Sequence, residues 1–501
     1  SHQQLGLALA LLRNFVVLTG GPGTGKTSIV FALLRCLLRN GYKPEQIVMA
    51  APTGLAAQRL TDAIRKGFDA LPAHVRENGP DAAINDISAQ TLHRLLQYQP
   101  SRGTFRHHAD NPLTYDVVIV DEISMVGLVL MAQLFQAIKP DAKLVLLGDK
   151  DQLPSVEVGS FPGHLVPVDG RPSYSKEMQA RLANLLPHFK LLRQGRDHVL
   201  RDALVMLEEN YRSQKQIQET ARAINAQDET LLDRLPCCSL AGPLQAEKKP
   251  TSSDSISLAD LSRRGGCWLL EAPKADLNDW HRILRIWADH HYVNPSPGSD
   301  SYLDKVKRCQ PIQSTPSPHQ EELLIDLFND LAHCRVLTLI RSGPWGSEGI
   351  NNYLSQYLRS KMSRPGAGRL FPGAPVLVTR NDYDRELFNG DVGIAHQSSQ
   401  GGYGVVFQRS GQFLTIPQEA LPAHELAFAV TVHKSQGSEY NRLLLVLPPD
   451  GGRRLLTKEI LYTGVTRAKD LVLLYGSKDN LRSALLRKIE RTSGLAYLSA
   501  Y

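Results

Sequence analysis

Short, mostly apolar runs alternate along the chain with longer stretches whose apolar residues recur at helical spacing. In the first part of the chain the apolar runs cover 15–19, 47–51, 116–120 and 144–148, and helical spacing covers 3–14 and 28–38. Apolar runs of about four to eight residues, separated by amphipathic helices, are typical of parallel strands buried on both faces of a sheet. The pattern therefore predicts an α/β domain over 1–200.

The second half of the chain repeats this alternation, with interruptions. Strand-like runs lie at 335–340, 375–379, 428–432, 442–447 and 471–475. Short β segments at 391–394, 403–407 and 412–416, separated by Gly and Ser turns, predict a small inserted barrel at 381–424. Helical patches at 280–287 and 321–331 beside Pro- and Ser-rich breaks predict a variable helical insert over 228–331. We expect a second α/β domain to occupy 201–380 and 425–501.

Composition narrows the class of protein. The 501 residues are 42% hydrophobic and 21% charged with a formal net charge of +7, which predicts a multi-domain globular protein suited to a polyanionic partner. The six cysteines lack the paired spacing of zinc sites, which favours a reducing compartment and no structural metal. No apolar run approaches the ~18 residues of a membrane span. No leader-like segment opens the chain, so we expect a cytoplasmic protein that does not use a membrane.

The clearest chemical signal is the segment Gly-Gly-Pro-Gly-Thr-Gly-Lys-Thr at 20–27, between a predicted strand and a predicted helix. It matches the phosphate-binding loop, in which backbone N–H groups and a helix N-terminus surround an anion. Lys26 is the expected contact for the β- and γ-phosphates of ATP, and Thr27 the expected Mg²⁺ ligand. The amide of Gln3 is expected to read the adenine edge. The remaining expected nucleotide contacts are Gly21, Pro22, Gly23, Thr24, Gly25 and Ser28.

Three further predicted strand ends carry polar residues suited to hydrolysis or to polymer binding. Asp121 is predicted to hold Mg²⁺, and the adjacent Glu122 to orient and deprotonate the attacking water. Gln152 is predicted to hydrogen-bond phosphate in one nucleotide state and to release it in the next. Thr53 and Gly54 offer a hydroxyl and exposed N–H groups that can hold a phosphate of a polymer lying across the sheet.

Together these segments resemble motifs I, Ia, II and III of superfamily 1 helicases. The segments are 20–27, Ala-Pro-Thr-Gly at 51–54, Val-Asp-Glu-Ile-Ser at 120–124 and Gly-Asp-Lys-Asp-Gln at 148–152. Motifs IV, V and VI are resembled by Asn-Tyr-Arg-Ser at 210–213, Thr-Val-His-Lys-Ser-Gln-Gly-Ser-Glu at 431–439 and Tyr-Thr-Gly-Val-Thr-Arg at 462–467. The resemblance covers nearly the whole chain. Stretches at 90–96, 387–393 and 490–496 are most similar to the RecD family, the helicase subunits of bacterial RecBCD (exonuclease V) complexes.

The resemblance implies two RecA-like P-loop NTPase domains, and an SH3-like form for the inserted barrel. It implies that Arg212 and Arg467 act as arginine fingers from the second motor domain, with Lys26, Glu122 and Gln152 as the other catalytic residues. Residues implied near the nucleotide are Gln436, Gly437 and Glu439. Residues implied to face single-stranded nucleic acid are Thr91, His93, Asn381, Thr431, His433, Lys434 and Ser435. A hairpin insert at 97–112 would separate strands through Tyr98, Phe105 or His107.

The expected activity is therefore that of an ATP-dependent helicase. The resemblance implies 5′ to 3′ movement on single-stranded DNA, opening of duplex junctions, and a role in double-strand break repair and recombination. It also implies RecB-like and RecC-like partners, which the family contacts through a domain ahead of the phosphate loop that this sequence does not contain; the start at Ser1 suggests a fragment. The residues alone leave open an RNA helicase, or an ATP-binding regulatory subunit without processive unwinding.

Overall fold

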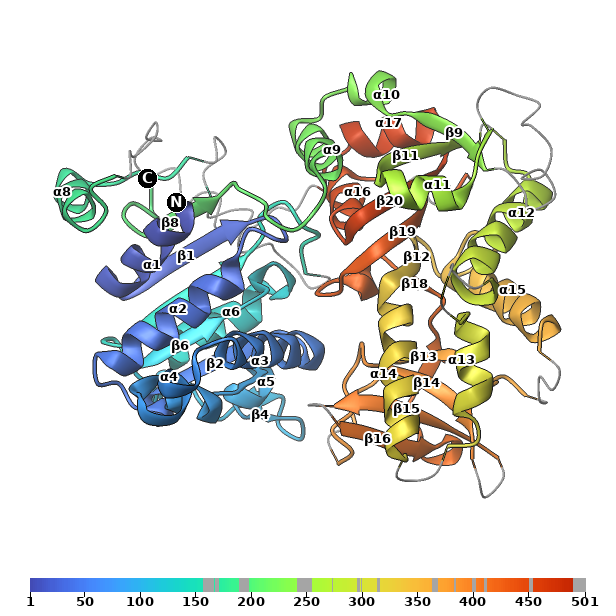
Figure 1. The fold of residues 1–501 in the computed structure, drawn as a ribbon. Helices are drawn as coiled ribbons and strands as arrows, with labels where there is room; N and C mark the ends of the chain where they lie inside the picture. The colour runs from blue at the N-terminus through green and yellow to red at the C-terminus, as the bar shows by residue number, and fades with distance from the viewer. Residues whose placement is uncertain are drawn as a thin grey trace. The chain divides into compact units, whose positions relative to one another are not determined.

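A computed structural model describes most of the chain and divides it into two compact units, Ser1–Arg212 and Ser213–Ile489. The described residues are 1–155, 166, 171–188, 198–240, 255–272, 274–294, 298, 300–312, 316–362, 368–382, 384–398, 402–409, 412–449 and 454–489. The 490–496 stretch that contributed to the resemblance lies outside them. Each unit is built on a parallel sheet and is described here by itself (Figure 1).

The first unit contains a six-stranded parallel sheet in the order β3-β2-β6-β7-β1-β8. Its strands are β1 (Phe15–Gly20), β2 (Ile47–Ala51), β3 (Ala89–Thr91), β6 (Val117–Val120), β7 (Lys143–Gly148) and β8 (Leu204–Leu207). The four apolar runs predicted as strands are all present. The predicted boundary at residue 200 falls too early, because β8 pairs in parallel with β1 and completes this sheet.

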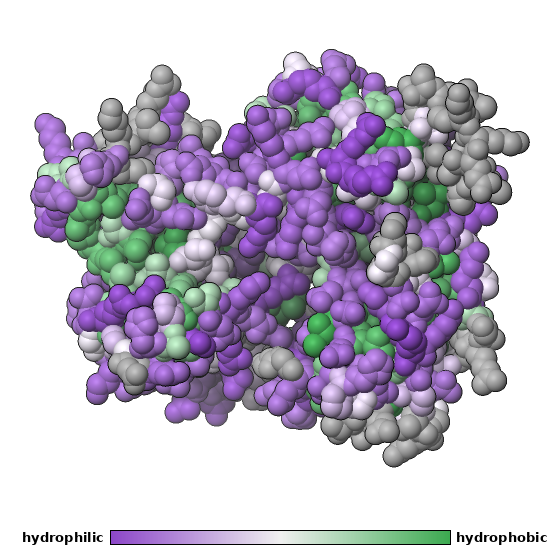
Figure 2. Space-filling model, viewed as in Figure 1, coloured by the Kyte–Doolittle hydropathy of each residue, from purple (hydrophilic) through white to green (hydrophobic). Residues whose placement is uncertain are grey.

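Helices cover both faces of the first sheet, as its mostly apolar central strands require. They are α1 (His2–Leu12), α2 (Lys26–Arg39), α3 (Gly54–Asp69), α4 (Ala73–Asn78), α5 (Leu92–Leu95), α6 (Leu128–Ala137) and α8 (Lys176–Leu185). Val16 and Leu18 of β1 pack in the core with α1, α2, α3 and α8, whereas Val17 packs with α5 and α6. Each such buried aliphatic side chain stabilises the fold by about 1.5 to 3 kcal/mol. The unit's surface is not uniformly polar: Figure 2 shows an apolar area over α1 and α2, where Leu11 is 39% exposed.

The second unit contains a seven-stranded parallel sheet in the order β10-β9-β11-β20-β19-β12-β18. Its strands are β9 (Cys237–Leu240), β10 (Ser255–Ile256), β11 (Gly266–Glu271), β12 (Cys334–Thr338), β18 (Ala429–Thr431), β19 (Tyr440–Val446) and β20 (Ala468–Gly476). Its helices are α9 (Lys215–Ala226), α10 (Leu231–Arg234), α11 (Leu258–Arg264), α12 (Leu277–Ala288), α13 (Tyr302–Cys309), α14 (Pro318–His333), α15 (Ser347–Ser360), α16 (Lys458–Val465) and α17 (Lys478–Leu486).

The sequence predicted a helical insert over residues 228–331, but this segment is only partly helical. They supply β9, β10 and β11, and β11 pairs along its whole length with the long strand β20. Parallel pairing joins segments that are distant in sequence, so a strand such as β11 gains its partner only in the folded chain. The helical patches predicted in this region are present as α12 and α14.

A five-stranded antiparallel sheet is inserted into the second unit, in the order β16-β15-β14-β13-β17. Its strands are β13 (Pro375–Val378), β14 (Val392–Gln397), β15 (Tyr403–Arg409), β16 (Gln412–Pro417) and β17 (His424–Leu426). Strand β13, predicted as part of the parallel sheet, instead pairs with β14 and β17. Closure of β16 onto β17 is not found among the described residues, so the SH3-like barrel stays a prediction. The inserted sheet shares one hydrophobic core with α12, α13 and α14.

No helix in the described ranges has the length and apolar character needed to cross a bilayer.

Candidate functional site

The loop at 20–27 joins β1 to α2 in the conformation that anion binding requires. Gly23 and Gly25 have φ angles of 78° and 84°, a region that favours glycine. A Cβ atom on Gly25 would also lie 2.0 Å from Nε2 of Gln3. Helix α2 begins at Lys26, so its unpaired N-terminal N–H groups adjoin the loop. The loop is therefore a backbone cradle with the positive end of a helix at its base.

Three side chains of this unit donate hydrogen bonds to main-chain carbonyls of the loop. Nζ of Lys26 donates hydrogen bonds to the carbonyl oxygens of Gly20 at 2.6 Å and Gly21 at 3.1 Å. The Thr24 hydroxyl donates to the Gly21 carbonyl at 2.8 Å, and Nε2 of Gln3 donates to the Thr24 carbonyl at 3.0 Å. The predicted adenine-reading amide is thus anchored to the loop through its nitrogen. The lysine ammonium can exchange carbonyl partners for an anion without a large movement of the backbone.

Asp121 and Glu122 follow β6 next to this cradle. The main-chain N–H of Asp121 donates to the Ala50 carbonyl at 2.9 Å, and the N–H of Glu122 donates to Oδ1 of Asp121 at 2.8 Å. Burial, reinforced by the charge of Glu122 and opposed by that of Lys26, raises the pKa of Asp121 to about 6. A bound cation would favour the ionised carboxylate. Glu122 has a φ of 54°, a left-handed conformation that costs a non-glycine residue about 1 to 3 kcal/mol and tends to occur at functional sites.

Gln152 follows β7 and is held by a residue that the sequence prediction overlooked. Asp149 is 2% exposed; its Oδ2 accepts a hydrogen bond from Nε2 of Gln152 at 3.1 Å, and its Oδ1 accepts one from the N–H of Asp151 at 3.0 Å. Oε1 of Gln152 is buried and has no hydrogen-bond partner among the described residues. An oxygen acceptor of this kind suits a water molecule better than a phosphate oxygen.

The resemblance implied that Arg212 belongs to the second motor domain. In the structure it belongs to the first unit, as the last residue of the segment Ser1–Arg212. Nδ2 of Asn210 donates to the Pro22 carbonyl at 2.8 Å, its Oδ1 accepts from the N–H of Arg212 at 2.8 Å, and the N–H of Tyr211 donates to the Gly23 carbonyl at 3.0 Å. These bonds fasten 210–212 to the phosphate loop. The next residue, Ser213, donates from its hydroxyl to the Ala468 carbonyl in the second unit.

The first unit also contains polar residues predicted to hold nucleic acid. The hydroxyls of Thr53 and Thr91 cap α3 and α5, accepting main-chain hydrogen bonds at 3.2 Å each. Strands β4 (Tyr98–Gln99) and β5 (Thr104–Phe105) form an antiparallel hairpin. The His93 ring centroid lies 5.6 Å from that of Tyr98 and 5.9 Å from that of Phe105. His107 instead lies beyond the hairpin strands, with Nδ1 3.2 Å from the Asn111 carbonyl.

Arg467 is the most deeply buried cation among the predicted site residues, with 2% exposure. Its Nε donates to the Thr463 carbonyl at 3.2 Å and its Nη1 to the Ser438 carbonyl at 3.4 Å. Nη2 is buried and has no hydrogen-bond partner in the described ranges, where no carboxylate pairs with this guanidinium. Because an unpaired buried donor costs about 1 to 3 kcal/mol or more, Nη2 is suited to receive an anion.

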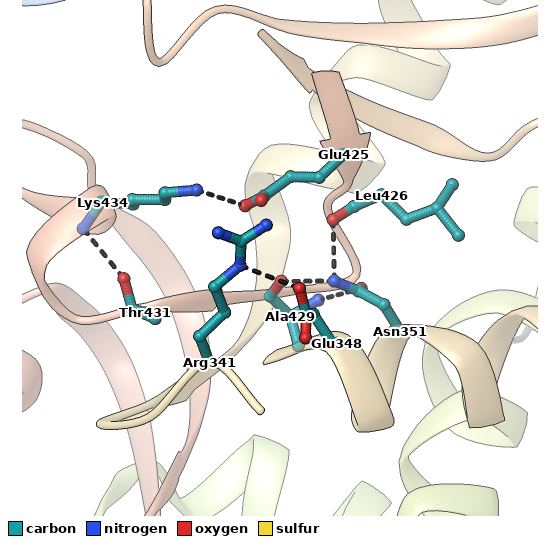
Figure 3. Close-up of polar contacts among 8 residues, drawn as sticks. All are labelled: Arg341, Glu348, Asn351, Glu425, Leu426, Ala429, Thr431 and Lys434. Carbon is teal, nitrogen blue, oxygen red and sulfur yellow. Dashed lines mark hydrogen bonds and ion pairs between the residues drawn. The ribbon is translucent and has the colours of Figure 1, made fainter. Parts of the chain in front are cut away.

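The loop from Thr431 to Glu439 contains the other predicted residues of the second unit. Nζ of Lys434 forms an ion pair with Oε1 of Glu425 at 2.7 Å, and Figure 3 shows the two side chains pointing toward each other. The Ser435 side chain is buried, and its hydroxyl donates to the Val432 carbonyl. Gly437 has a φ of 73°, and Glu439 lies 3.8 Å from Nζ of Lys469. Asn381 is separate from this loop: its Oδ1 accepts from the N–H of Asn389 at 2.8 Å.

Asn351 fixes the chain where it passes from the inserted sheet to β18, a role that no motif predicted. Its Nδ2 donates to the carbonyls of Leu426 at 2.7 Å and Ala429 at 2.9 Å, and its Oδ1 accepts from the N–H of Ala429 at 2.8 Å (Figure 3). The side chain is 5% exposed. Strand β18 is thereby held against α15.

Two family models match the chain: an AAA domain over residues 3–158, and a UvrD-like helicase C-terminal domain over residues 426–475. The RecBCD enzyme subunit RecD of Mycobacterium tuberculosis is 33% identical over 99% of this chain and 72% of its own length. The ATP-dependent RecD2 DNA helicase of Deinococcus radiodurans is 27% identical over 95% of this chain and 49% of its own length. A solved Pif1 helicase from Candida albicans is 14% identical, covers 96% of each chain and has a TM-score of 0.41.

The two matched models lie in different units, and the RecD alignment runs through both. The chain belongs to the RecD family of superfamily 1 helicases.

Proposed function

We propose that this chain is an ATP-driven motor that moves on single-stranded DNA and opens duplexes ahead of it. The observation that carries the proposal is the grouping, within one unit of a RecD-family chain, of a lysine-bearing phosphate cradle with Asp121 and Glu122. The cradle alone would bind a nucleotide, whereas hydrolysis needs a metal ligand and a group that activates water. DNA is the proposed polymer because RecD2 is named a DNA helicase.

The residues of the first unit fit ATP and Mg²⁺. The positive φ angles of Gly23 and Gly25 turn the loop backbone inward, and Lys26 is already held at the loop. Asp121 offers a carboxylate whose pKa is raised by burial and by the charge of Glu122, so a bound cation would favour its ionised form. Thr27 and Asp121 would hold Mg²⁺, which when bound neutralises phosphate charge. Gln3 would lie beside the base.

Glu122 is the proposed general base, and Gln152 the proposed partner of the attacking water through its unpaired Oε1. Arg467, with its unpaired Nη2, would stabilise charge that develops on the transferred phosphoryl group, and Arg212 would assist beside Gly23. Gly437 and Glu439 would complete the nucleotide contacts.

The strand path would use Thr53, Gly54, Thr91 and His93 of the first unit, and Asn381, Thr431, His433, Lys434 and Ser435 of the second. Because such contacts go to the phosphate backbone, binding would be sequence-tolerant and salt-sensitive. The hairpin would meet the duplex junction through Tyr98, Phe105 or His107. We further propose 5′ to 3′ movement, a role in break repair, and assembly with RecB-like and RecC-like subunits, since the M. tuberculosis relative is named a RecBCD subunit.

The decisive experiment measures ATPase activity with single-stranded DNA, single-stranded RNA or no polymer, followed by unwinding of duplexes tailed at the 5′ or the 3′ end. We expect stimulation by DNA and unwinding from a 5′ tail. Stimulation by RNA alone would make the chain an RNA helicase. Nucleotide binding without polymer-stimulated turnover would indicate a regulatory subunit.

A second experiment tests the hairpin. Deletion of residues 97–106 should abolish duplex unwinding while DNA-stimulated ATPase persists, because the motor residues lie elsewhere in the fold. Unwinding at the original rate would remove the hairpin from the mechanism.

A further inference from the structure

The hairpin formed by β4 and β5 has two chemically different sides. On one side, Tyr98 and Phe105 make ring contacts with His93 of α5, a proposed contact of the tracked strand. The two hairpin rings also contact each other, with centroids 5.1 Å apart. This side is aromatic and adjoins the proposed path of the tracked strand.

The other side of the hairpin borders a hollow of about 680 Å³ whose far wall is α6. The volume falls within the ~300–1,000 Å³ typical of small-molecule sites. The hollow is lined by Gln99, Arg102, Gly103, Thr104, Phe105, Arg106, His108 and Asn111 of the hairpin segment, and by Val129 and Gln133 of α6. Phe105 borders both sides of the hairpin and so separates them.

The two walls of the hollow differ in charge. Arg102 and Arg106 are exposed, and neither forms an ion pair with a carboxylate in the described part of the chain. Nη1 of Arg106 donates only to the amide oxygen of Gln97, at 3.1 Å. The opposite wall is uncharged: it is formed by Val129, which is 70% exposed, and by the amide side chain of Gln133. A cationic wall that faces an uncharged wall with an exposed aliphatic side chain suits a ligand with a phosphate and a planar base.

We propose that this hollow binds the first unpaired nucleotide of the strand that the motor displaces. Arg102 and Arg106 contact its phosphate, and its base lies between Phe105 and Val129. The hairpin then holds both products of strand separation, one on each side, which prevents the two strands from re-annealing behind the junction. This inference rests on the proposed helicase function and adds to it a binding site for the second strand.

The test uses forked DNA with a 2-aminopurine at the first unpaired position of the displaced strand. The informative variant is Val129→Glu, because Val129 lies on α6 and not on the hairpin, and its exposure allows the substitution without loss of the fold. Gln136→Glu is the matched control: it adds the same charge to an exposed position of the same helix, outside the hollow. Arg102→Ala combined with Arg106→Ala tests the cationic wall.

With the wild-type chain we expect the probe's fluorescence to change on binding. Val129→Glu and the double arginine variant should each weaken the preference for forked over tail-only DNA by about tenfold, and the arginine variant should also reduce the salt dependence of fork binding. Gln136→Glu should behave as wild type. An unchanged fork preference in Val129→Glu, or a probe response only on the tracked strand, overturns the inference.

The same measurements separate this inference from the proposed function. If the wild-type chain shows no DNA-stimulated ATPase, the proposed function fails whatever the fork data show. If ATPase is stimulated but the fork preference of Val129→Glu matches wild type, only the displaced-strand site fails. Loss of binding to another protein in Val129→Glu, with fork binding intact, would assign the α6 wall to a protein partner and likewise overturn the proposal.

Discussion

The two parallel sheets differ in the strand ends at which their candidate residues lie. In the first sheet, the phosphate loop, Asp121 and Gln152 all follow the carboxyl ends of strands, the usual position of ligands in such sheets. In the second sheet, Thr431 is the last residue of β18, but Glu439 and Arg467 immediately precede the amino ends of β19 and β20. In the first sheet these candidate residues thus lie at the carboxyl ends of the strands, whereas in the second they lie at both the carboxyl and the amino ends.

A single short loop joins the carboxyl end of β18 to the amino end of β19. Thr431 is in register with Thr338 of β12, and Arg442 with Cys334 at the opposite end of the same strand. Residues 432–439 therefore run back along the sheet, from the proposed strand contacts to the proposed nucleotide contacts.

Lys26 of the first unit and Arg467 of the second, the two cations proposed to contact phosphate, differ in how their polar atoms are hydrogen-bonded. Lys26 is satisfied by carbonyl groups of its own loop, so the first unit holds its cation ready whether or not an anion is present. Arg467 is buried with Nη2 unpaired. An anion bound at Nη2 would offset that cost. The following predictions test this contrast.

The largest effect is expected from Lys26→Gln. The amide cannot supply the charge that phosphate binding needs, so DNA-stimulated ATPase should fall below detection while much of the single-strand affinity persists. Lys139→Gln is the control, because Lys139 is a lysine of the same unit that pairs with Asp116. ATP turnover at a normal rate in Lys26→Gln would contradict the assignment of the phosphate loop.

Next in size is Arg467→Lys, which keeps the charge but loses the planar fork. We expect kcat to fall about 10³-fold with nucleotide affinity near normal, since the arginine acts on the transition state. Arg335→Lys is the control: Arg335 is also buried in the second unit and held by main-chain carbonyls, so it should lower Tm without a comparable loss of rate. A loss of affinity alone in Arg467→Lys would place the arginine outside catalysis.

The fold was predictable where burial leaves an unbroken apolar run. Residues 47–51 and 144–148 have no polar side chain and became central strands, as expected. Strand β8 is an apolar run of only four residues at the sheet edge, which is short for a strand predicted from sequence. Cys237 and Ser239 of β9 are exposed, so β9 lacks the continuous apolar pattern of a central strand. Strand β13 was placed in the wrong sheet because an apolar run carries no information about the direction of its partners.

The candidate site was predictable to the extent that its residues lie in contiguous motifs. Arg212 was recognised, but its attachment to the first unit depends on Asn210, whose bonds to Pro22 cross a long sequence separation. Asp149, which holds Gln152, sits within a recognised motif yet was not assigned a role. Glu425 lies nine positions from Lys434, in the inserted sheet, where no motif pointed to it.

A smaller effect is expected from Asn210→Ala, which releases 210–212 from the phosphate loop. Without the bonds to Pro22 and Arg212, the guanidinium of Arg212 would be positioned less often, and we expect kcat to fall about tenfold. Asn40→Ala removes a similar side-chain bond, from Nδ2 to the Cys36 carbonyl at the far end of α2, and should leave kcat unchanged. Equal rates in the two variants would make Asn210 a purely structural residue.

The smallest effect is expected from Glu425→Gln. This substitution should strengthen the binding of single-stranded DNA, whereas the substitutions above should lower the rate of ATP hydrolysis. Lys434 is paired with Glu425 in the chain without DNA, so a phosphate must compete with that carboxylate for the ammonium. Removing the charge should raise single-strand affinity about threefold and make it more salt-dependent, because one more cation is available to the backbone. Glu348→Gln breaks the neighbouring pair with Arg341 and should not change the affinity through Lys434 (Figure 3). Weaker binding in Glu425→Gln would mean that the carboxylate positions Lys434 for DNA instead of restraining it, and that the second unit, like the first, holds its strand-facing cation ready in advance.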